Sequence, residues 1–147
     1  MTLAMTPAER ERFLSEVRVG ILSIPEAGRG PLSMPVWYLY EPGGDVRIMT
    51  GRKTRKAKRL QAAGRASLCV QEPAPPYQYV TIEGPVTIEP AKPERDLPPL
   101  AQRYLGPEEG ERYVTNSAAR REEGGDILVR IRPERWLSED YSKRGGV

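Results

Sequence analysis

A run of basic residues at positions 52–59 is the part of this sequence best suited to chemistry. Lys or Arg fills six of these eight positions. The chain has 23 basic residues, and the 17 outside this run face 20 acidic ones, so the net charge of +3 comes from one local patch. No Asp or Glu occurs at positions 46–71. A patch of this kind predicts an anionic partner.

The expected position of the run on a helix favours a small phosphate ligand. The sequence predicts a helix at about 54–63, with Ala57 and Leu60 facing inward and Gly64 ending it. The N-terminal end of a helix disfavours each cation by about 0.3–1 kcal/mol at low salt. A phosphate bound there would accept hydrogen bonds from backbone N–H groups and from basic side chains together. Four cations are expected near this end: Arg52, Lys53, Arg55 and Lys56.

Two other interpretations compete with a phosphate site. Nucleic acid is a common partner of basic runs, but positions 46–71 contain no aromatic residue on which a base could stack. A solvated helix face is the usual fate of a charge run, but here the neighbouring carboxylates are missing. We therefore favour a small phosphate ligand over nucleic acid.

The composition excludes several classes of catalytic site. The chain has no histidine, which removes Ser-His-Asp triads and imidazole-based zinc sites. Its single cysteine, Cys69, excludes an intramolecular disulfide and a multi-cysteine metal site, and no metal is expected. No apolar run is long enough to span a membrane, and no secretory signal is evident, so we expect a cytoplasmic protein. An enzyme of this composition would rely on a bound cofactor, whereas a binding protein needs no histidine at all.

Short strands are expected to position the basic helix. The predicted strands lie at 17–24, 31–40, 46–50, 66–71, 77–89 and 126–132. Pro35 predicts an edge, a bulge or an opening in the second strand, and Gly84-Pro85 predicts a bend or a bulge in the fifth. A polar loop is expected at 120–125, and a tail that docks through Trp136 and Leu137 and then frays. The pattern predicts a single domain over residues 1–147, mainly β (α+β), as a small barrel of about six antiparallel strands with short peripheral helices.

Four segments in this order carry a resemblance to a known family: "PVWYLY", "VRIMT", "TRKAKRLQAAGRASLCVQ" and "YQYVTIEGPVTI". They resemble the pyridoxamine 5′-phosphate oxidase-like split β-barrel family over about residues 8–90. More narrowly, they resemble its flavin/deazaflavin oxidoreductases, including enzymes that use coenzyme F420. The resemblance implies a split barrel, a homodimer, and a cofactor in each groove between the subunits. The flat ring of the cofactor would lie along residues 34–37 and 48–50, with its phosphate at 52–56.

The resemblance also implies which residues bind the cofactor. Lys56, four residues before Leu60, matches the lysine that holds the phosphate, although Arg59 stands where the family often has Asn. Trp37 has an equally good role as a packing anchor. The expected cofactor-binding residues are Lys56, Arg55, Lys53, Arg52, Thr50, Met49, Pro35, Val36 and Trp37.

The function implied is hydride transfer between a bound deazaflavin (F420) or flavin and a small organic substrate. The surplus of cations favours F420, because its polyglutamate tail adds negative charge beyond the phosphate, whereas FMN needs fewer cations. The alternatives are an FMN-binding pyridoxamine phosphate oxidase-like protein and a cofactor-binding protein without catalytic activity. No side chain stands out in the sequence as a general acid.

Overall fold

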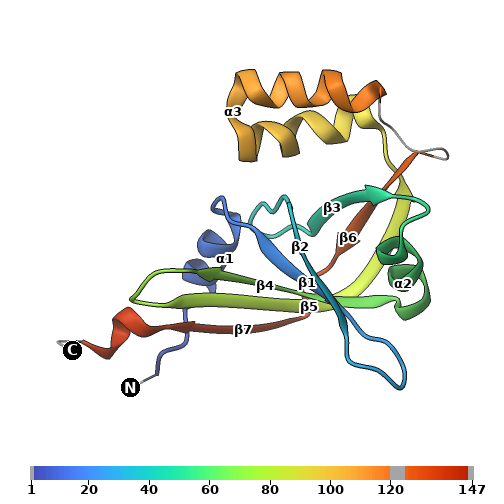
Figure 1. The fold of residues 1–147 in the computed structure, drawn as a ribbon. Helices are drawn as coiled ribbons and strands as arrows, with labels where there is room; N and C mark the ends of the chain where they lie inside the picture. Colours follow the sequence, from blue (N-terminus) through green and yellow to red (C-terminus); the bar gives the residue numbers. More distant parts are fainter. Residues whose placement is uncertain (1, 120–124, 146–147) are drawn as a thin grey trace.

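The structure, a computed structural model, describes residues 2–119 and 125–145. In these ranges it contains an antiparallel sheet of seven strands with three α-helices and one short 3-10 helix (Figure 1). The elements are α1 (Pro7–Ser15), β1 (Gly20–Ile24), β2 (Leu32–Val36), β3 (Val46–Gly51), α2 (Arg55–Ala63), β4 (Arg65–Glu72), β5 (Gln78–Pro90), α3 (Pro93–Ala119), β6 (Asp126–Ile131), β7 (Arg135–Asp140) and the 3-10 helix (Tyr141–Arg144). The predicted mainly β split barrel is confirmed.

The long strand β5 joins the two halves of the sheet. The strand order is β2-β1-β4-β5-β6-β3, and β7 also pairs with β5. The first part of β5 pairs with β4 and β7, and its last five residues pair with β6. Gly84 lies at the change of partner, where an added Cβ would be only 1.7 Å from the carbonyl oxygen of Arg132. The predicted bend at Gly84 is confirmed, and its cause is this close approach of two backbones.

The two strands at the ends of this order, β2 and β3, are connected through the segment that follows β2. Leu39 and Arg47 form an isolated antiparallel bridge, with N–H···O distances of 3.0 and 2.9 Å. Because Leu39 follows β2 and Arg47 lies on β3, this bridge connects the two ends of the curled sheet. Pro35 lies on β2, the edge strand, which can accommodate a residue without an N–H donor. The predicted edge position is confirmed.

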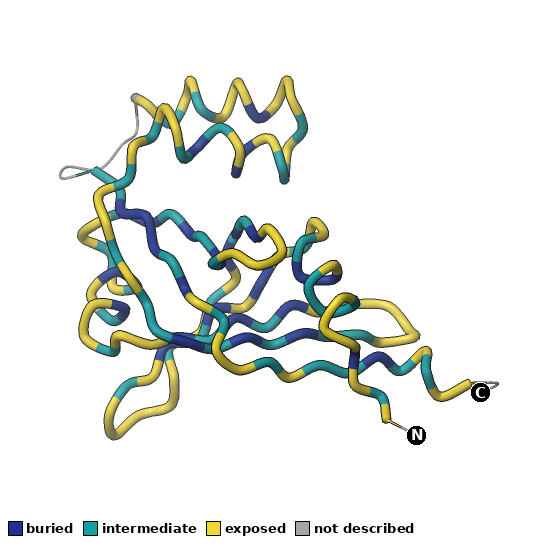
Figure 2. Tube along the Cα trace, turned by 180° about the vertical axis from the view of Figure 1, so that it is seen from behind, coloured by how far each residue is buried: buried dark blue, intermediate teal, exposed yellow. Residues whose placement is uncertain are grey.

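The core lies inside the curl, and alternation along the strands fills it. In β3 the side chains of Val46, Ile48 and Thr50 are buried, while those between them are only partly covered (Figure 2). Helix α1 closes the core with Phe13 and Leu14. Further buried strand residues are Leu22, Ile24, Leu68, Val70, Val80, Ile82, Val129 and Ile131.

Helix α3 is a hairpin of two helical arms, residues 93–105 and 107–119. Gly106 separates them with φ 83° and ψ 173°, a conformation that favours glycine. The arms touch at Gly110, where a Cβ would meet the backbone of Gln102 at 2.9 Å. Figure 1 shows the hairpin standing over β3 and β6. No helix within the described ranges is both long and apolar enough to cross a membrane.

The structure corrects two expected boundaries. The first strand begins at Gly20 and not at residue 17, because Arg18 turns toward α1, where its guanidinium lies 3.7 Å from the Phe13 ring centroid. The second strand ends at Val36 rather than at residue 40, because the chain there leaves β1 and crosses to β3.

The expected fraying of the tail after Leu137 is wrong for its described residues, which extend to Gly145. Strand β7 continues to Asp140 by pairing with the first part of β5, and the 3-10 helix follows. Trp136 packs edge-to-face on Tyr40 with ring centroids 6.2 Å apart, but Leu137 is 59% exposed and does not dock. The loop expected at 120–125 lies, apart from Gly125, outside the described residues.

Candidate functional site

Local signals in the sequence position the basic helix. The Thr54 hydroxyl caps α2 by accepting the Ala57 N–H at 3.1 Å, and it also donates to the Gly51 carbonyl at 2.8 Å. Gly64 ends the helix with φ 67°. Because Ala57 and Leu60 are fully buried, they fix the inward face of α2 and direct the basic side chains outward or toward its first turn.

A cavity of about 310 Å³ adjoins the first turn of α2, and we call it the α2 cavity. Its wall brings together six of the nine predicted cofactor-binding residues, from β2 and the residue that follows it, from β3 and from α2. These are Lys56, Thr50, Met49, Pro35, Val36 and Trp37. Four lining residues were not predicted: Leu97, Leu100, Tyr113 and Asp126.

Lys56 supplies the cation of this cavity. Burial lowers the pKa of its amino group below the ordinary lysine value. No hydrogen bond or ion pair joins the Lys56 amino group to another residue of the described ranges. A partly desolvated ammonium without a counter-charge gains free energy when an anion binds beside it. The α2 cavity is therefore suited to an anionic ligand.

The three other basic residues predicted for the site do not line the cavity. Arg52 and Lys53 are exposed, and the backbone N–H of Arg52 donates to the Gly125 carbonyl at 3.1 Å. The Arg55 guanidinium lies 3.9 Å from the Glu26 carboxylate. The structure thus brings Lys56 to the cavity wall and leaves the other three on the surface near it.

The expectation that the basic run lacks carboxylate partners is wrong for two of its residues. Glu26, in the loop between β1 and β2, lies 3.9 Å from Arg55 and 3.9 Å from Arg59. Glu26 is far from the run in sequence, so its proximity arises only when β1 and α2 pack together. This pairing offsets part of the positive charge on one side of α2 and leaves Lys56 without a partner.

Trp37 is held by aromatic residues of α3. Its indole stacks on the Tyr104 ring, with centroids 4.9 Å apart and planes 6° apart, and Tyr113 lies at 5.5 Å. The Tyr104 hydroxyl donates to the Arg18 carbonyl at 2.7 Å and accepts the Tyr38 N–H at 3.1 Å. One face of the indole is therefore covered by the protein itself. The sequence contained no signal that Tyr104 would lie against the segment that follows β2.

Several solved structures are similar in fold to this chain. A search of solved structures found a conserved hypothetical protein from Mycobacterium tuberculosis, 26% identical, covering 97% of this chain and 89% of that one, with a TM-score of 0.75. An F420 reductase is similar at 20% identity, with coverages of 86% and 94% and a TM-score of 0.68. An FAD-binding protein from Mesorhizobium loti is also 20% identical, with coverages of 92% and 93% and a TM-score of 0.64.

A search of curated proteins found no match. The family model described as pyridoxamine 5′-phosphate oxidase matches residues 6–139 of this chain, which include every strand except the last residue of β7. The resemblance of the four sequence segments is thus confirmed over nearly the whole fold. This chain belongs to the pyridoxamine 5′-phosphate oxidase family.

Proposed function

We propose that the protein is an oxidoreductase that holds a deazaflavin or flavin cofactor in the α2 cavity and transfers a hydride between the cofactor and a small organic substrate. The observation that carries this proposal is Lys56, a partly buried ammonium without a counter-ion among the described residues, beside the first turn of a helix. A cofactor phosphate fits this position, because the N-terminal turn of α2 adds backbone N–H groups that have no partner within the helix.

The residues that line the α2 cavity also fit the flat ring of such a cofactor. Pro35 and Val36 end the edge strand β2 and Trp37 follows them, while Met49 and Thr50 of β3 line the same cavity. The edge of β2 is not covered by another strand, so its backbone is accessible to a ring edge. Arg52, Lys53 and Arg55 remain proposed as an outer group that attracts the charged end of the cofactor.

The cofactor, when bound, supplies the hydride chemistry, and the protein binds, orients and shields it. Leu97 and Leu100 of α3 are buried beside the cavity and limit the access of water to it. The Tyr113 hydroxyl and the Asp126 carboxyl are polar groups of the same wall that were not predicted, and either one can form a hydrogen bond to a ligand in the cavity.

Between the two cofactors we favour F420, because the surplus of cations outside the cavity suits a polyanionic tail. The similarity in fold to an F420 reductase agrees with this choice. The test is to titrate the apoprotein separately with F420 and with FMN, following cofactor fluorescence. Tight binding of F420 is expected. Tight binding of FMN alone would reverse the choice of cofactor, and binding of neither would contradict the proposed function.

Catalysis is tested separately from binding. The loaded protein is mixed with a panel of small electron acceptors, and the absorbance of the reduced cofactor is followed. Oxidation of the cofactor by at least one acceptor is expected. Binding without turnover across the whole panel would instead support the alternative, a cofactor-binding protein without catalytic activity.

We also propose that two copies of the chain associate through the outer face of β1 and β4. Val17, Val19 and Ile21 are exposed by 57%, 49% and 41%, and together with Cys69 they form the apolar part of an open groove that also has polar and charged residues in its wall. This face continues into the α2 cavity, because Ile21 is the register partner of both Cys69 on β4 and Pro35 on β2. A second copy seated here would lie beside the cofactor.

Light scattering after size-exclusion chromatography tests this association. A dimer is expected, and Ile21→Asp should give a monomer, because it places a charge in the apolar contact. Asn116→Asp, at an exposed position on the second arm of α3, is the control and should remain dimeric. A monomeric wild-type protein would contradict the proposal.

We propose a cytoplasmic location for the protein. Its sequence has a single cysteine, which agrees with this location.

A further inference from the structure

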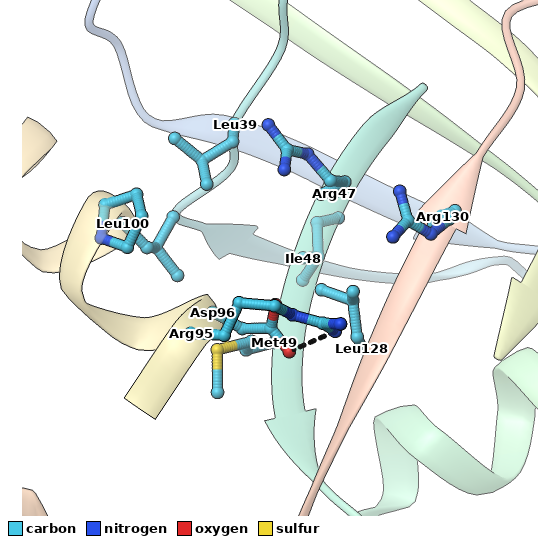
Figure 3. A pocket seen from close by; sticks show the side chains of 10 residues that line it. Leu39, Arg47, Ile48, Met49, Arg95, Asp96, Leu100, Leu128 and Arg130 are labelled. Atoms are coloured by element: carbon cyan, nitrogen blue, oxygen red, sulfur yellow. Dashed lines mark hydrogen bonds and ion pairs between the residues drawn. The ribbon is translucent and has the colours of Figure 1, made fainter. Parts of the chain in front are cut away.

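A second cavity, of about 240 Å³, lies between α3 and the outer face of β3 and β6, and we call it the arginine cavity. It adjoins the α2 cavity, since Met49 and Leu100 line both. Its wall combines apolar side chains with three arginines and one carboxylate (Figure 3). The polar residues are Arg47, Arg95, Arg130 and Asp96, and the apolar ones include Leu39, Met49, Pro99, Leu100 and Leu128.

Two of the three arginines are already paired with carboxylates. Arg95 binds Asp96 through two hydrogen bonds, from Nε to Oδ1 at 2.7 Å and from Nη2 to Oδ2 at 3.0 Å. This contact holds the pKa of Asp96 below its usual range, so that the pair is a neutral unit at pH 7. Arg130 donates from Nε and Nη2 to a single oxygen of Glu89, at 3.2 and 3.1 Å.

Arg47 is the arginine without such a partner. Its guanidinium makes no hydrogen bond to any residue in the described part of the chain, and its nearest carboxylate is Glu41 at 3.9 Å. The Glu41 side chain is 86% exposed, and an ion pair that is so long and so open contributes little. The cavity therefore contains about one uncompensated positive charge, on a guanidinium that is itself only 32% exposed.

The position of Arg47 beside Arg130 strengthens the case for a ligand. The two residues are direct register partners on β3 and β6, and in Figure 3 the Arg130 side chain extends toward β3 while the Arg47 guanidinium extends toward Leu39. Like charges placed directly opposite on neighbouring strands are destabilising. An anion bound in the cavity beside Arg47 would offset this repulsion and supply the hydrogen-bond acceptors that Arg47 lacks.

We infer that the arginine cavity binds the carboxylate group of a small acid with an apolar body, held by Arg47 with help from Arg130, and that this acid is the substrate. A single carboxylate matches the surplus of about one charge, and the leucine and methionine side chains match an apolar body rather than an inorganic ion. The role as substrate site rests on the proposed function, because the wall shared through Met49 and Leu100 places the apolar end of the acid toward the cofactor. The binding of the acid to the arginine cavity does not itself depend on the proposed function.

Calorimetric titration of the full chain without cofactor tests the inference. The probes are cinnamate and its uncharged counterpart cinnamamide. Cinnamate is expected to bind at least about tenfold more tightly than the amide, because hydrogen bonds to charged groups are the stronger ones. Equal affinity for the two would overturn the inference. Inorganic phosphate should not displace cinnamate at equal concentration, and displacement would overturn the assignment to an acid with an apolar body.

Variants assign the site to its residues. Arg47→Gln should abolish the preference for the acid, and Arg47→Lys should retain part of it, because the charge remains while the planar fork is lost. Arg135→Gln, on exposed β7, is the matched control and should behave like the wild type. A preference that survives Arg47→Gln overturns the inference, provided that thermal melting shows the variant folded.

The outcomes separate this inference from the proposed function. Arg47→Gln should leave the affinity for F420 or FMN within about twofold, because Arg47 does not line the α2 cavity. Cofactor binding without cinnamate binding contradicts only the inference about the acid. Cinnamate binding without cofactor binding contradicts the proposed function, and with it the role of the acid as substrate.

Discussion

The indole of Trp37 and the phenol ring of Tyr104 are stacked, with their centroids 4.9 Å apart and their planes within 6° of each other. This contact connects the segment after β2 with the first arm of α3. Both the α2 cavity and the arginine cavity lie where this arm meets the sheet. The position of α3, and with it the shape of the site, therefore depends on this contact.

Tyr104→Phe tests how strongly the hydroxyl holds α3 in place. The stack on Trp37 remains, but the Tyr38 N–H loses its acceptor and the Arg18 carbonyl loses its donor. We expect the free energy of unfolding to fall by about 1–3 kcal/mol, the cost of leaving partly buried polar groups unpaired. Urea denaturation measures this change. Tyr113→Phe, at an exposed tyrosine on the second arm, should change stability by less than about 0.5 kcal/mol, and equal losses in the two variants would contradict the role given to Tyr104.

Lys56→Ala tests the phosphate position. We expect cofactor binding to weaken by about 1–3 kcal/mol, which is roughly 5–150-fold, because a charged hydrogen bond in a partly desolvated site is lost. Lys58→Ala is the matched control, since Lys58 is exposed on the same helix and does not line the cavity. Fluorescence titration compares the two variants. Similar losses would show that the helix attracts the cofactor only through its overall charge.

Gly84→Ala tests the bend of β5. The added methyl group would lie 1.7 Å from the Arg132 carbonyl oxygen, which is backbone and cannot rotate away. We expect a loss of about 3 kcal/mol of stability or more, at or beyond the upper end of ordinary overpacking. Gly30→Ala is the control, because no atom lies within 4 Å of its added Cβ. Chemical denaturation of both variants measures the difference, and a Gly84→Ala protein as stable as the control would refute the close approach.

Protonation of the Glu9 carboxyl is expected to lower the stability of the folded protein at acidic pH. Its hydrogen bond from Lys143 and those from Thr6 lower the pKa of the carboxyl from 4.5 to about 2. The folded state thus binds this proton more weakly than the unfolded state, so the stabilisation is complete above about pH 4.5 and is lost as the pH falls toward 2.

Glu9→Gln should therefore reduce the decline in melting temperature between pH 5 and pH 2. Circular dichroism melts at several pH values measure the slope. Glu111→Gln, which removes an exposed carboxylate from the second arm of α3, is the comparison and should keep the wild-type slope. A slope unchanged by Glu9→Gln would show that Glu9 does not interact with Lys143 in solution.

Local features of the sequence predicted the core of the candidate site. The Thr54 cap and the Gly64 stop act within one turn of α2, so neighbouring residues suffice to predict that helix. Pro35 predicted an edge strand because it has no N–H donor, and Gly84 predicted a bend because it has no Cβ, and both are properties of the residue itself. Together with the family resemblance, these signals predicted six residues that line one cavity.

The tertiary structure alone decided what surrounds those residues. Glu26 reaches Arg55 and Arg59, β7 pairs with β5, and Arg47 lies beside Arg130, although each contact joins residues far apart in the chain. A hydrophobic pattern specifies which face of an element is buried, but it does not specify the element that covers this face. The curl of the sheet and the bend at Gly84 set those neighbours, and they thereby create the arginine cavity and leave Lys56 without a counter-ion.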